Sequence, residues 1–246
     1  MKTSARFAPP LSSLQHRLLV AGTAFVALAA IAHAGRAAWP VALAALVVGI
    51  GAHLGVVGVV LLLAYAALGW LTRILRVRDV LRIVEALALR GDETVLDLGT
   101  GDGIVAIAVA KRLESGRVIA SDDWRRAHGS RKLSAALVEH NARAEGVGAR
   151  VHVLTSPFER LDLADASVDR AVACLSLHHL PAGDRARAVS ELVRVLRPGG
   201  TILLAEPFRR VELARGLERA GFTVTHGGIT FPRWLFGWIT ARRAAR

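Results

Sequence analysis

The stretch "VLDLGTGDGIVAIAVAKRL", residues 95–113, joins an apolar run to a helical pattern through a loop with a glycine at every second position. The apolar run is typical of a buried strand, and from Ile104 the apolar residues have helical spacing. Glycines let a backbone approach a ligand closely. Amides near the start of a helix can receive an anionic group such as a carboxylate. We therefore expect a ligand to bind between this strand and this helix.

The spacing of the glycines discriminates between nucleotide sites. A dinucleotide-binding loop has the pattern G-x-G-x-x-G, but here Gly99, Gly101 and Gly103 alternate, and Ile104 stands where the third glycine would fall. A P-loop has Lys followed by Ser or Thr after its glycines, and this loop has neither. The pattern therefore argues against NAD and ATP as ligands.

From residue 94 onward, predicted strands and helices alternate. Strands are expected at 94–98, 117–121, 150–154, 168–175, 201–205, 222–225 and 235–241, and helices at 104–113, 133–145, 185–196 and 211–220. Such alternation predicts an α/β fold with a mainly parallel sheet covered by helices on both faces. Ligands of these sheets bind at the carboxyl ends of the strands, which is where the glycine loop falls.

Four segments, in order, resemble the class I S-adenosylmethionine-dependent methyltransferase family. They are "DLGTGDG" (97–103), "VIASDD" (118–123), "FERLDLADASVDRAV" (158–172) and "ELVRVLRPGGTILLAEP" (191–207). The resemblance covers roughly residues 78–243. It implies a Rossmann-like, seven-stranded sheet whose last strand is antiparallel to the others. It also implies S-adenosylmethionine as cofactor and methyl transfer as the activity.

The resemblance places cofactor-binding residues on this sequence. Asp97 would lie near the methionine end of the cofactor. The cradle would consist of Gly99, Thr100, Gly101 and Gly103. Asp122 would accept hydrogen bonds from both ribose hydroxyls, and Asp123 is the alternative, although its side chain points to the opposite face in a strand pattern. Cys174, at the end of the fourth predicted strand, would also line the cofactor site.

The chain departs from the family after the third predicted strand. Where relatives often have an acid that contacts the adenine amine, this chain reads Thr155-Ser156-Pro157-Phe158. Ser156, Phe158 or backbone groups would then contact the adenine. This departure is the feature that favours a non-catalytic alternative.

The segment "CLSLHHLP", residues 174–181, follows the fourth strand at the methyl-transfer face of the family. His178 or His179 could act as a general base or orient a nucleophile, and the alternative is a loop histidine that packs the pocket or caps the next helix. Cys174 is the only cysteine, which excludes an internal disulfide and a metal site built from cysteines. We expect no metal.

The N-terminal part has a different composition. Residues 37–72 contain no Lys, Arg, Asp or Glu, and apolar runs at 18–34 and 41–70 are long enough to be two transmembrane helices. Basic residues flank both ends: Lys2, Arg6, Arg17, Arg73, Arg76, Arg78 and Arg82. The positive-inside rule then places both ends in the cytoplasm. A cleaved signal peptide at the first run, or a soluble core hairpin, are the alternatives. We expect a membrane region at 1–72 and the methyltransferase domain at 73–246.

The N-terminal part also contains three glycines that could pack helices together and one amphipathic stretch. Gly51, Gly55 and Gly58 favour close packing of the two helices or a homodimer, unless they are simply part of a glycine-rich membrane sequence. Residues 73–89 have one apolar face and predict a separate amphipathic helix.

Two other segments leave alternatives open. The basic segment 122–134 either folds over the cofactor or is a solvated loop. Four aromatic residues near the C-terminus are either core residues of the last strand or rest on a bilayer: Phe231, Trp234, Phe236 and Trp238.

The sequence thus predicts an integral protein of the inner or cytoplasmic membrane with a cytoplasmic methyltransferase domain. Its substrate would be a hydrophobic small molecule or a lipid. The net charge of +12 is dispersed as Arg on helical patterns, which favours an anionic lipid surface over nucleic acid as partner. The alternative is a membrane-anchored, non-catalytic protein that binds S-adenosylmethionine or acts as a scaffold.

Overall fold

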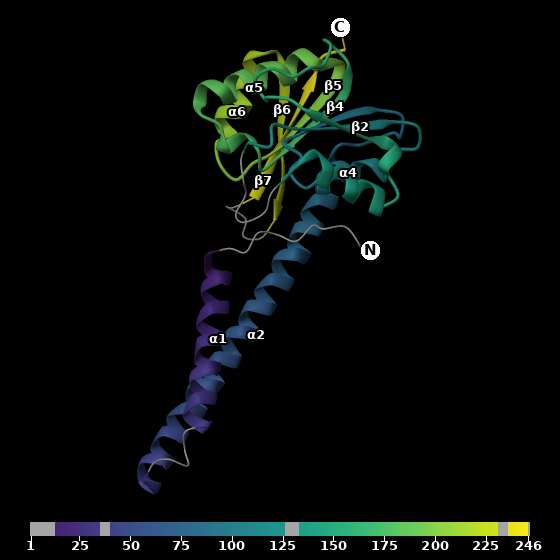
Figure 1. Cartoon of the computed structure of the whole chain (residues 1–246). Coiled ribbons are helices and arrows are strands. Elements are labelled where there is room, and N and C mark those ends of the chain that lie inside the picture. Colours follow the sequence, from purple (N-terminus) through teal and green to yellow (C-terminus); the bar gives the residue numbers. More distant parts are fainter. Residues whose placement is uncertain (1–12, 35–39, 126–132, 231–235, 246) are drawn as a thin grey trace. The chain divides into compact units, whose positions relative to one another are not determined.

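The computed structural model describes residues 13–34, 40–125, 133–230 and 236–245 (Figure 1). The chain divides into two compact units, one made of residues 8–76 and the other mainly of residues 77–246. The first is a helical hairpin and the second is an α/β domain.

The hairpin consists of α1 (Ser13–Ala34) and the first part of α2 (Val41–Ala86). Small residues bring the two helices close together. A Cβ atom placed on Gly58 would lie 2.8 Å from the Gly22 carbonyl oxygen, and one on Gly51 would lie 2.8 Å from the Ala32 Cβ. Close packing between the helices through these glycines is therefore confirmed, whereas the homodimer stays a prediction.

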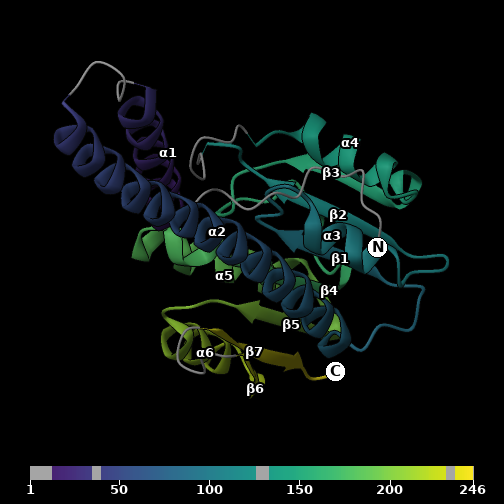
Figure 2. The same ribbon diagram turned by 90° about the horizontal axis from the view of Figure 1, so that it is seen from below.

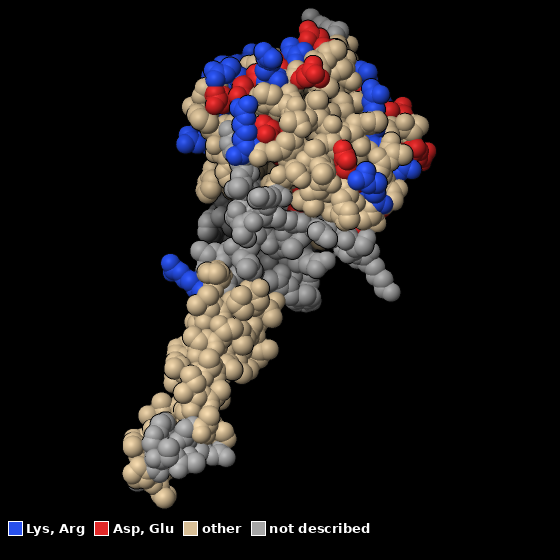
Figure 3. Space-filling model, viewed as in Figure 1, with Lys and Arg blue, Asp and Glu red and all other residues tan. Residues whose placement is uncertain are grey.

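The outer surface of the hairpin is apolar. Two stretches, His16–Ala34 and Leu43–Leu68, are long and apolar enough to cross a membrane, although a signal sequence or a core helix can have the same composition. Their side chains are largely exposed, for example Ile31, Leu46, Val56 and Leu63. On the face seen in Figure 3, charged side chains gather over the α/β domain and are almost absent from the hairpin.

Helix α2 differs from its prediction. The sequence predicts a membrane helix at 41–70 and an amphipathic helix at 73–89, but a single helix, α2, runs without interruption from Val41 to Ala86. No proline occurs between these residues, so nothing removes a backbone hydrogen bond at the change in polarity. The predicted amphipathic face exists within this longer helix, because Val80, Ile83 and Val84 are buried in the α/β domain.

The α/β domain contains a seven-stranded sheet in the order β3-β2-β1-β4-β5-β7-β6, which can be followed in Figure 2. The strands are β1 (Thr94–Leu98), β2 (Arg117–Asp122), β3 (Val151–Thr155), β4 (Val168–Cys174), β5 (Leu196–Ala205), β6 (Phe222–Thr230) and β7 (Phe236–Arg243). The pairs among β1 to β5 are parallel, and β7 is antiparallel to both β5 and β6. The predicted fold class is confirmed, including the antiparallel last strand.

Two apolar clusters cover the two faces of the sheet. One contains the end of α2 together with residues of α3 (Ile104–Ala110) and α4 (Ala135–Ala144). The other contains residues of α5 (Ala182–Val195) and α6 (Arg210–Arg219). Alternate residues of one strand enter opposite clusters, as Val95 and Leu96 do in β1, because successive side chains of a strand point to opposite faces.

Two strands in the C-terminal half of the α/β domain differ from their predicted boundaries. Strand β5 begins at Leu196 and includes the "RPGG" segment, with an irregular register opposite β4. Strand β6 extends to Thr230 because it pairs with β7 along most of its length. Trp238 is partly buried against the core, as the core interpretation predicts, while Phe231 and Trp234 lie outside the described residues and nothing is described of the Phe236 side chain.

Candidate functional site

The glycine loop follows β1 at the carboxyl end of the sheet. Gly99, Gly101 and Gly103 all have left-handed backbone conformations, with φ of 78°, 58° and 84°. The loop is held to the neighbouring strand, since the Ser121 carbonyl oxygen accepts the N–H groups of Gly99 (2.8 Å) and Thr100 (3.1 Å). The alternating glycines therefore mark a loop that curls tightly before α3.

Asp97 organises this loop from inside. Its side chain is buried, and Oδ2 accepts both the Thr100 hydroxyl (2.7 Å) and the Ala106 N–H in α3 (3.0 Å). Burial raises the pKa of Asp97 to about 7, although the hydrogen bonds from Thr100 and Ala106 act in the opposite direction. Asp97 thus links the end of β1 to the start of α3, and contact with a ligand stays a prediction for it and for Thr100.

Asp122 is the acid that faces the loop. Its Oδ2 accepts the Gly101 N–H and its Oδ1 accepts the Trp124 N–H, both at 3.0 Å. Burial raises the pKa of Asp122, and these two N–H bonds oppose the rise. The neighbouring Asp123 instead accepts the N–H of Arg125 at 3.1 Å. The structure therefore brings Asp122, rather than Asp123, to the glycine loop, and each Asp122 oxygen retains a lone pair for a further donor.

Two glycines of the loop are required for different reasons. A Cβ atom on Gly99 would lie 2.2 Å from the Ser176 Cβ, so this position contacts the segment after β4 directly. A Cβ atom on Gly101 would meet, among the described residues, nothing nearer than Leu133 Cδ1 at 3.9 Å. Gly99 is therefore fixed by the protein's own packing, whereas the open side of Gly101 has room for a ligand.

Trp124 connects the ends of two strands beside Asp122. It has a left-handed backbone conformation, with φ of 56°, and its indole Nε1 donates to the Thr155 hydroxyl at the end of β3 (2.8 Å). A non-glycine residue in this conformation is uncommon and often occurs at functional sites. Of the basic segment 122–134, residues 126–132 lie outside the described residues.

The loop after β4 carries the two histidines, in the short helix η3 (Leu177–His179). His178 Nδ1 lies 2.5 Å from Oε2 of Glu206, which follows β5 and is completely buried. Glu206 Oε1 accepts the N–H groups of Ser176 (2.9 Å) and Leu177 (2.8 Å). His179 is exposed, and its ring centroid is 3.8 Å from that of His178.

Glu206 is the residue of this region that the sequence analysis missed. The signal was available, because an acid directly follows the apolar run "TILLA" at the carboxyl end of a predicted strand. Its importance depends on β5 lying next to β4, which the order of elements along the chain does not specify.

The known proteins to which the chain is similar include methyltransferases. Residues 95–200 match the family model described as a methyltransferase domain. A ubiquinone/menaquinone biosynthesis C-methyltransferase of Syntrophotalea carbinolica is 32% identical over 126 residues, which are 51% of this chain and 48% of the relative. The 27-O-demethylrifamycin SV methyltransferase of Amycolatopsis mediterranei is 33% identical over 140 residues, which are 56% of this chain and 46% of the relative. The chain thus spans about half the length or less of these curated relatives.

A solved structure has the same fold. The 1,6-didemethyltoxoflavin-N1-methyltransferase of Burkholderia thailandensis, solved with 1,6-didemethyltoxoflavin and S-adenosylhomocysteine, has a TM-score of 0.53 and 24% identity. The match covers 68% of this chain and 78% of that one. Residues 95–200 carry a methyltransferase domain, and the fold is that of solved S-adenosylmethionine-dependent methyltransferases.

The loop of the methyltransferase domain fits the cofactor of its class. Gly101 leaves an open backbone surface beside the carboxylate of Asp122, and that carboxylate can accept further hydroxyl donors. Amides at the start of α3 suit an anionic group. The residues of this chain that would hold S-adenosylmethionine are therefore the glycine loop and Asp122.

Three residues that the sequence analysis predicted to contact the cofactor are hydrogen-bonded locally or packed in the interior of the methyltransferase domain. The Ser156 hydroxyl donates to the Arg160 carbonyl oxygen (3.0 Å) and accepts the Asp162 N–H (3.2 Å). Phe158 is 4% exposed and packs in the core. Cys174 is partly buried at the end of β4. Cofactor contact remains a prediction for all three, and adenine recognition by Ser156 would have to compete with the hydroxyl's local bonds.

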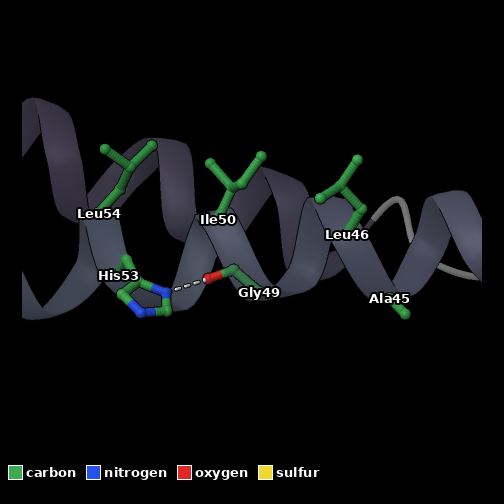
Figure 4. A pocket seen from close by; sticks show the side chains of 6 residues that line it. All are labelled: Ala45, Leu46, Gly49, Ile50, His53 and Leu54. Atoms are coloured by element: carbon green, nitrogen blue, oxygen red, sulfur yellow. Dashed lines mark hydrogen bonds between the residues drawn. The ribbon is translucent and has the colours of Figure 1, made fainter.

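A hollow on the hairpin lies outside the methyltransferase domain. It is lined by Ala45, Leu46, Gly49, Ile50, His53 and Leu54, all from α2, and in Figure 4 the side chains of Leu46, Ile50 and Leu54 point away from those of Ala45 and His53. His53 Nδ1 is 2.7 Å from the carbonyl oxygen of Gly49, one turn earlier in the same helix. The hollow contains none of the residues that the sequence motifs single out.

Proposed function

We propose that this protein binds S-adenosylmethionine and transfers its methyl group, at the cytoplasmic face of a membrane, to a hydrophobic small molecule or lipid. The observation that carries the proposal is the hydrogen bond between Gly101 N–H and Asp122 Oδ2, next to the open side of Gly101. The names of the relatives, which include a ubiquinone/menaquinone biosynthesis C-methyltransferase, support a hydrophobic acceptor.

Each part of the site has a role in this proposal. The loop amides bind the carboxylate of the cofactor, and Asp122 accepts its ribose hydroxyls. When bound, S-adenosylmethionine supplies a methyl group on a positively charged sulfur. The protein then has to align a nucleophile with that methyl group, because transfer requires near-attack geometry. His178 lies two residues after Ser176, whose side chain lies against Gly99 of the loop.

The membrane location rests on the hairpin. Its apolar side chains are largely exposed, and an exposed apolar surface of this extent marks an interaction site or a bilayer. Basic residues flank both outer ends of the two apolar runs, which favours cytoplasmic ends. A substrate that resides in the bilayer would explain why a methyltransferase domain carries such a hairpin.

A non-catalytic scaffold is the second candidate. It is favoured by the segment after β3, which lacks the acid of relatives and in which Ser156 and Phe158 are buried. A scaffold would keep its partner when the cofactor loop is altered.

Calorimetric titration of S-adenosylmethionine into the detergent-solubilised full chain tests the cofactor part. We expect micromolar binding, a loss of at least about 10-fold for Asp122→Ala because charge-assisted bonds are removed, and no detectable binding for Gly101→Val. Gly146→Val is the matched control, because Gly146 has a similar φ of 74° and, among the described residues, no atom within 4 Å of its added Cβ. Absence of binding to the folded wild-type protein would favour the scaffold.

Methyl transfer is tested with S-adenosylmethionine labelled on the methyl group and a lipid extract of bacterial membranes. We expect label to enter the organic phase with the wild-type chain and not with Gly101→Val. Binding without transfer would leave the cofactor site in place and refute a lipid-soluble acceptor from that extract.

A further inference from the structure

Glu206 is a buried carboxylate whose partners are defined. It has no exposed surface, and its Oε1 accepts two backbone N–H groups, from Ser176 and Leu177. Its Oε2 lies 2.5 Å from Nδ1 of His178. Among the described residues, no Lys or Arg forms an ion pair with it. A buried carboxylate is costly unless it is paired and hydrogen-bonded, so these contacts are specific requirements of the site.

The hydrogen-bond roles at this group follow from its donors. Oε1 acts as an acceptor twice, and the ionised form of the group has no proton to give, so in that form Oε2 also accepts. Nδ1 of His178 therefore carries the proton. A neutral imidazole has one N–H, and Nε2 is then left with its lone pair. The geometry thus selects one of the two tautomers of His178.

The ring of His178 is also placed for chemistry. Its side chain is 15% exposed, while that of Glu206 is fully buried. The Phe208 ring packs edge-on at a centroid distance of 6.3 Å. The same segment contacts the glycine loop through Ser176 and Gly99, and the Ser176 hydroxyl donates to the Leu98 carbonyl oxygen at 2.9 Å. Ser176, two residues before His178, thus ties this segment to the carboxyl end of β1, where the proposed cofactor binds.

We propose that Glu206 is a positioning residue that holds the proton of His178 on Nδ1, and that His178 Nε2 removes a proton from the methyl acceptor. This inference rests on the proposed function and deepens it. As the acceptor's O–H or activated C–H bond breaks, its electron pair forms the bond to the methyl carbon and its proton moves to Nε2. The electrons of the carbon–sulfur bond remain on sulfur.

The acceptor class follows from that step. A base is useful only when the nucleophile must lose a proton, as a phenolic hydroxyl or an acidic carbon does. A thioether or a tertiary amine has no such proton. The site therefore favours an acceptor with a hydroxyl or an activated C–H group.

Glu206→Gln is the most informative variant because it separates structure from proton placement. The carbonyl oxygen of the introduced side-chain amide can still accept the N–H groups of Ser176 and Leu177. The NH2 group of that amide then faces Nδ1 and donates to it, which moves the imidazole proton to Nε2. We expect unchanged folding, a dissociation constant for S-adenosylmethionine within about 2-fold, and methyl transfer reduced by about 10²-fold or more.

Solid-state NMR of the full chain, reconstituted in lipid bilayers and labelled with ¹⁵N-histidine, reads the tautomer without any acceptor. His178→Gln identifies the His178 signals by their loss, and His179→Gln is the control that leaves them in place. We expect a protonated Nδ1 in the wild-type protein and a protonated Nε2 in Glu206→Gln. A wild-type His178 protonated on Nε2 alone overturns the proposal, even if Glu206→Gln does not fold.

The outcomes distinguish this inference from the proposed function. Cofactor binding with the wrong tautomer, or with full methyl transfer by Glu206→Gln, overturns the role of Glu206 and leaves the cofactor site intact. Failure of S-adenosylmethionine to bind overturns the proposed function, and with it the role of His178 as a base. With labelled cofactor, methylation of a hydrophobic thioether and not of a matched hydroquinone would contradict the acceptor class.

Discussion

The hairpin and the α/β domain use apolar residues in opposite ways. In the domain, residues such as Leu96 and Ile202 are completely buried, and the charged residues lie mostly outside. In the hairpin, Ile31 and Val56 are more than 60% exposed, and the closest approaches between the helices are at glycines. Hydrophobicity alone therefore does not tell which residues form the interior. In the α/β domain, hydrophobic residues form the core. In the hairpin, they form the outer face, which needs an apolar environment.

The largest effect is expected where a domain glycine is fixed by both conformation and packing. Gly99→Ala would place a Cβ 2.2 Å from the Ser176 Cβ at a φ of 78°. Overpacking and backbone strain together should cost on the order of 5 kcal/mol. Thermal unfolding followed by circular dichroism should show a strongly lowered midpoint or no folded domain. A near wild-type midpoint would mean that the two loops do not pack as described.

The second prediction concerns the buried carboxyl of the domain. The pKa of Asp97 is about 7 in the folded protein and 3.8 for the ordinary group, so the folded state retains a proton that the unfolded state loses between these values. Stability should therefore fall as the pH rises from about 4 to about 7, by up to about 4 kcal/mol, and stay lower above that range.

Asp97→Asn tests this dependence, because the amide oxygen can still accept from Thr100 and Ala106 without ionising. The unfolding midpoint of the variant should change less between pH 4.5 and pH 7.5 than that of the wild-type protein. An identical pH profile in both proteins would argue that Asp97 is not the titrating group.

The sequence predicted part of the candidate site but not all of it. The pattern of Asp97 and the alternating glycines predicted the loop, because few residue types tolerate its backbone conformations. The family resemblance predicted an acid at the end of the second strand, and the strand pattern favoured Asp122 over Asp123. Glu206 was not predicted, because its role requires the side-by-side placement of β4 and β5 and the path of the segment after β4, and neither is encoded in local periodicity.

The continuity of α2 was missed for a different reason. The composition changes at residue 72, and hydropathy assigns the two sides to different environments. Helix continuity depends on backbone hydrogen bonds, which the same residues satisfy in either environment unless proline intervenes. Hydropathy therefore predicted the surroundings of each segment but not the end of the helix.

The third prediction probes the surroundings of the hairpin. Val56 in α2 is 65% exposed, and Val211 in α6 is 60% exposed. If a bilayer covers the hairpin, Val56→Arg should cost about 3 kcal/mol, while Val211→Arg should be tolerated. Flotation of the full chain with membranes should decrease for Val56→Arg only. Equal flotation of both variants would indicate that water or another protein covers this part of α2.

The smallest effect is expected for a hairpin glycine. A Cβ on Gly55 would lie 3.2 Å from the Ala29 Cβ, and this residue is helical, so no backbone strain accompanies the change. Gly55→Ala gains helix propensity of about 1 kcal/mol, which offsets a slight separation of the helices. Its unfolding midpoint should stay within a few degrees of the wild-type value. A collapse comparable to that of Gly99→Ala would mean that the interior of the hairpin is as rigid as that of the domain.

The two kinds of loop glycine have an evolutionary consequence. Gly99 is required by its contact with Ser176 and by its positive φ even when no ligand is bound, whereas Gly101 faces open space and, apart from its own positive φ, is constrained by what binds there. A descendant that lost catalysis but kept the fold would retain the first glycine and could replace the second by a residue such as Asn or Asp, which tolerates a positive φ. The residue at position 101, compared across relatives of this chain, would therefore record which lineages still use the cofactor, and position 99 would record only their common ancestry.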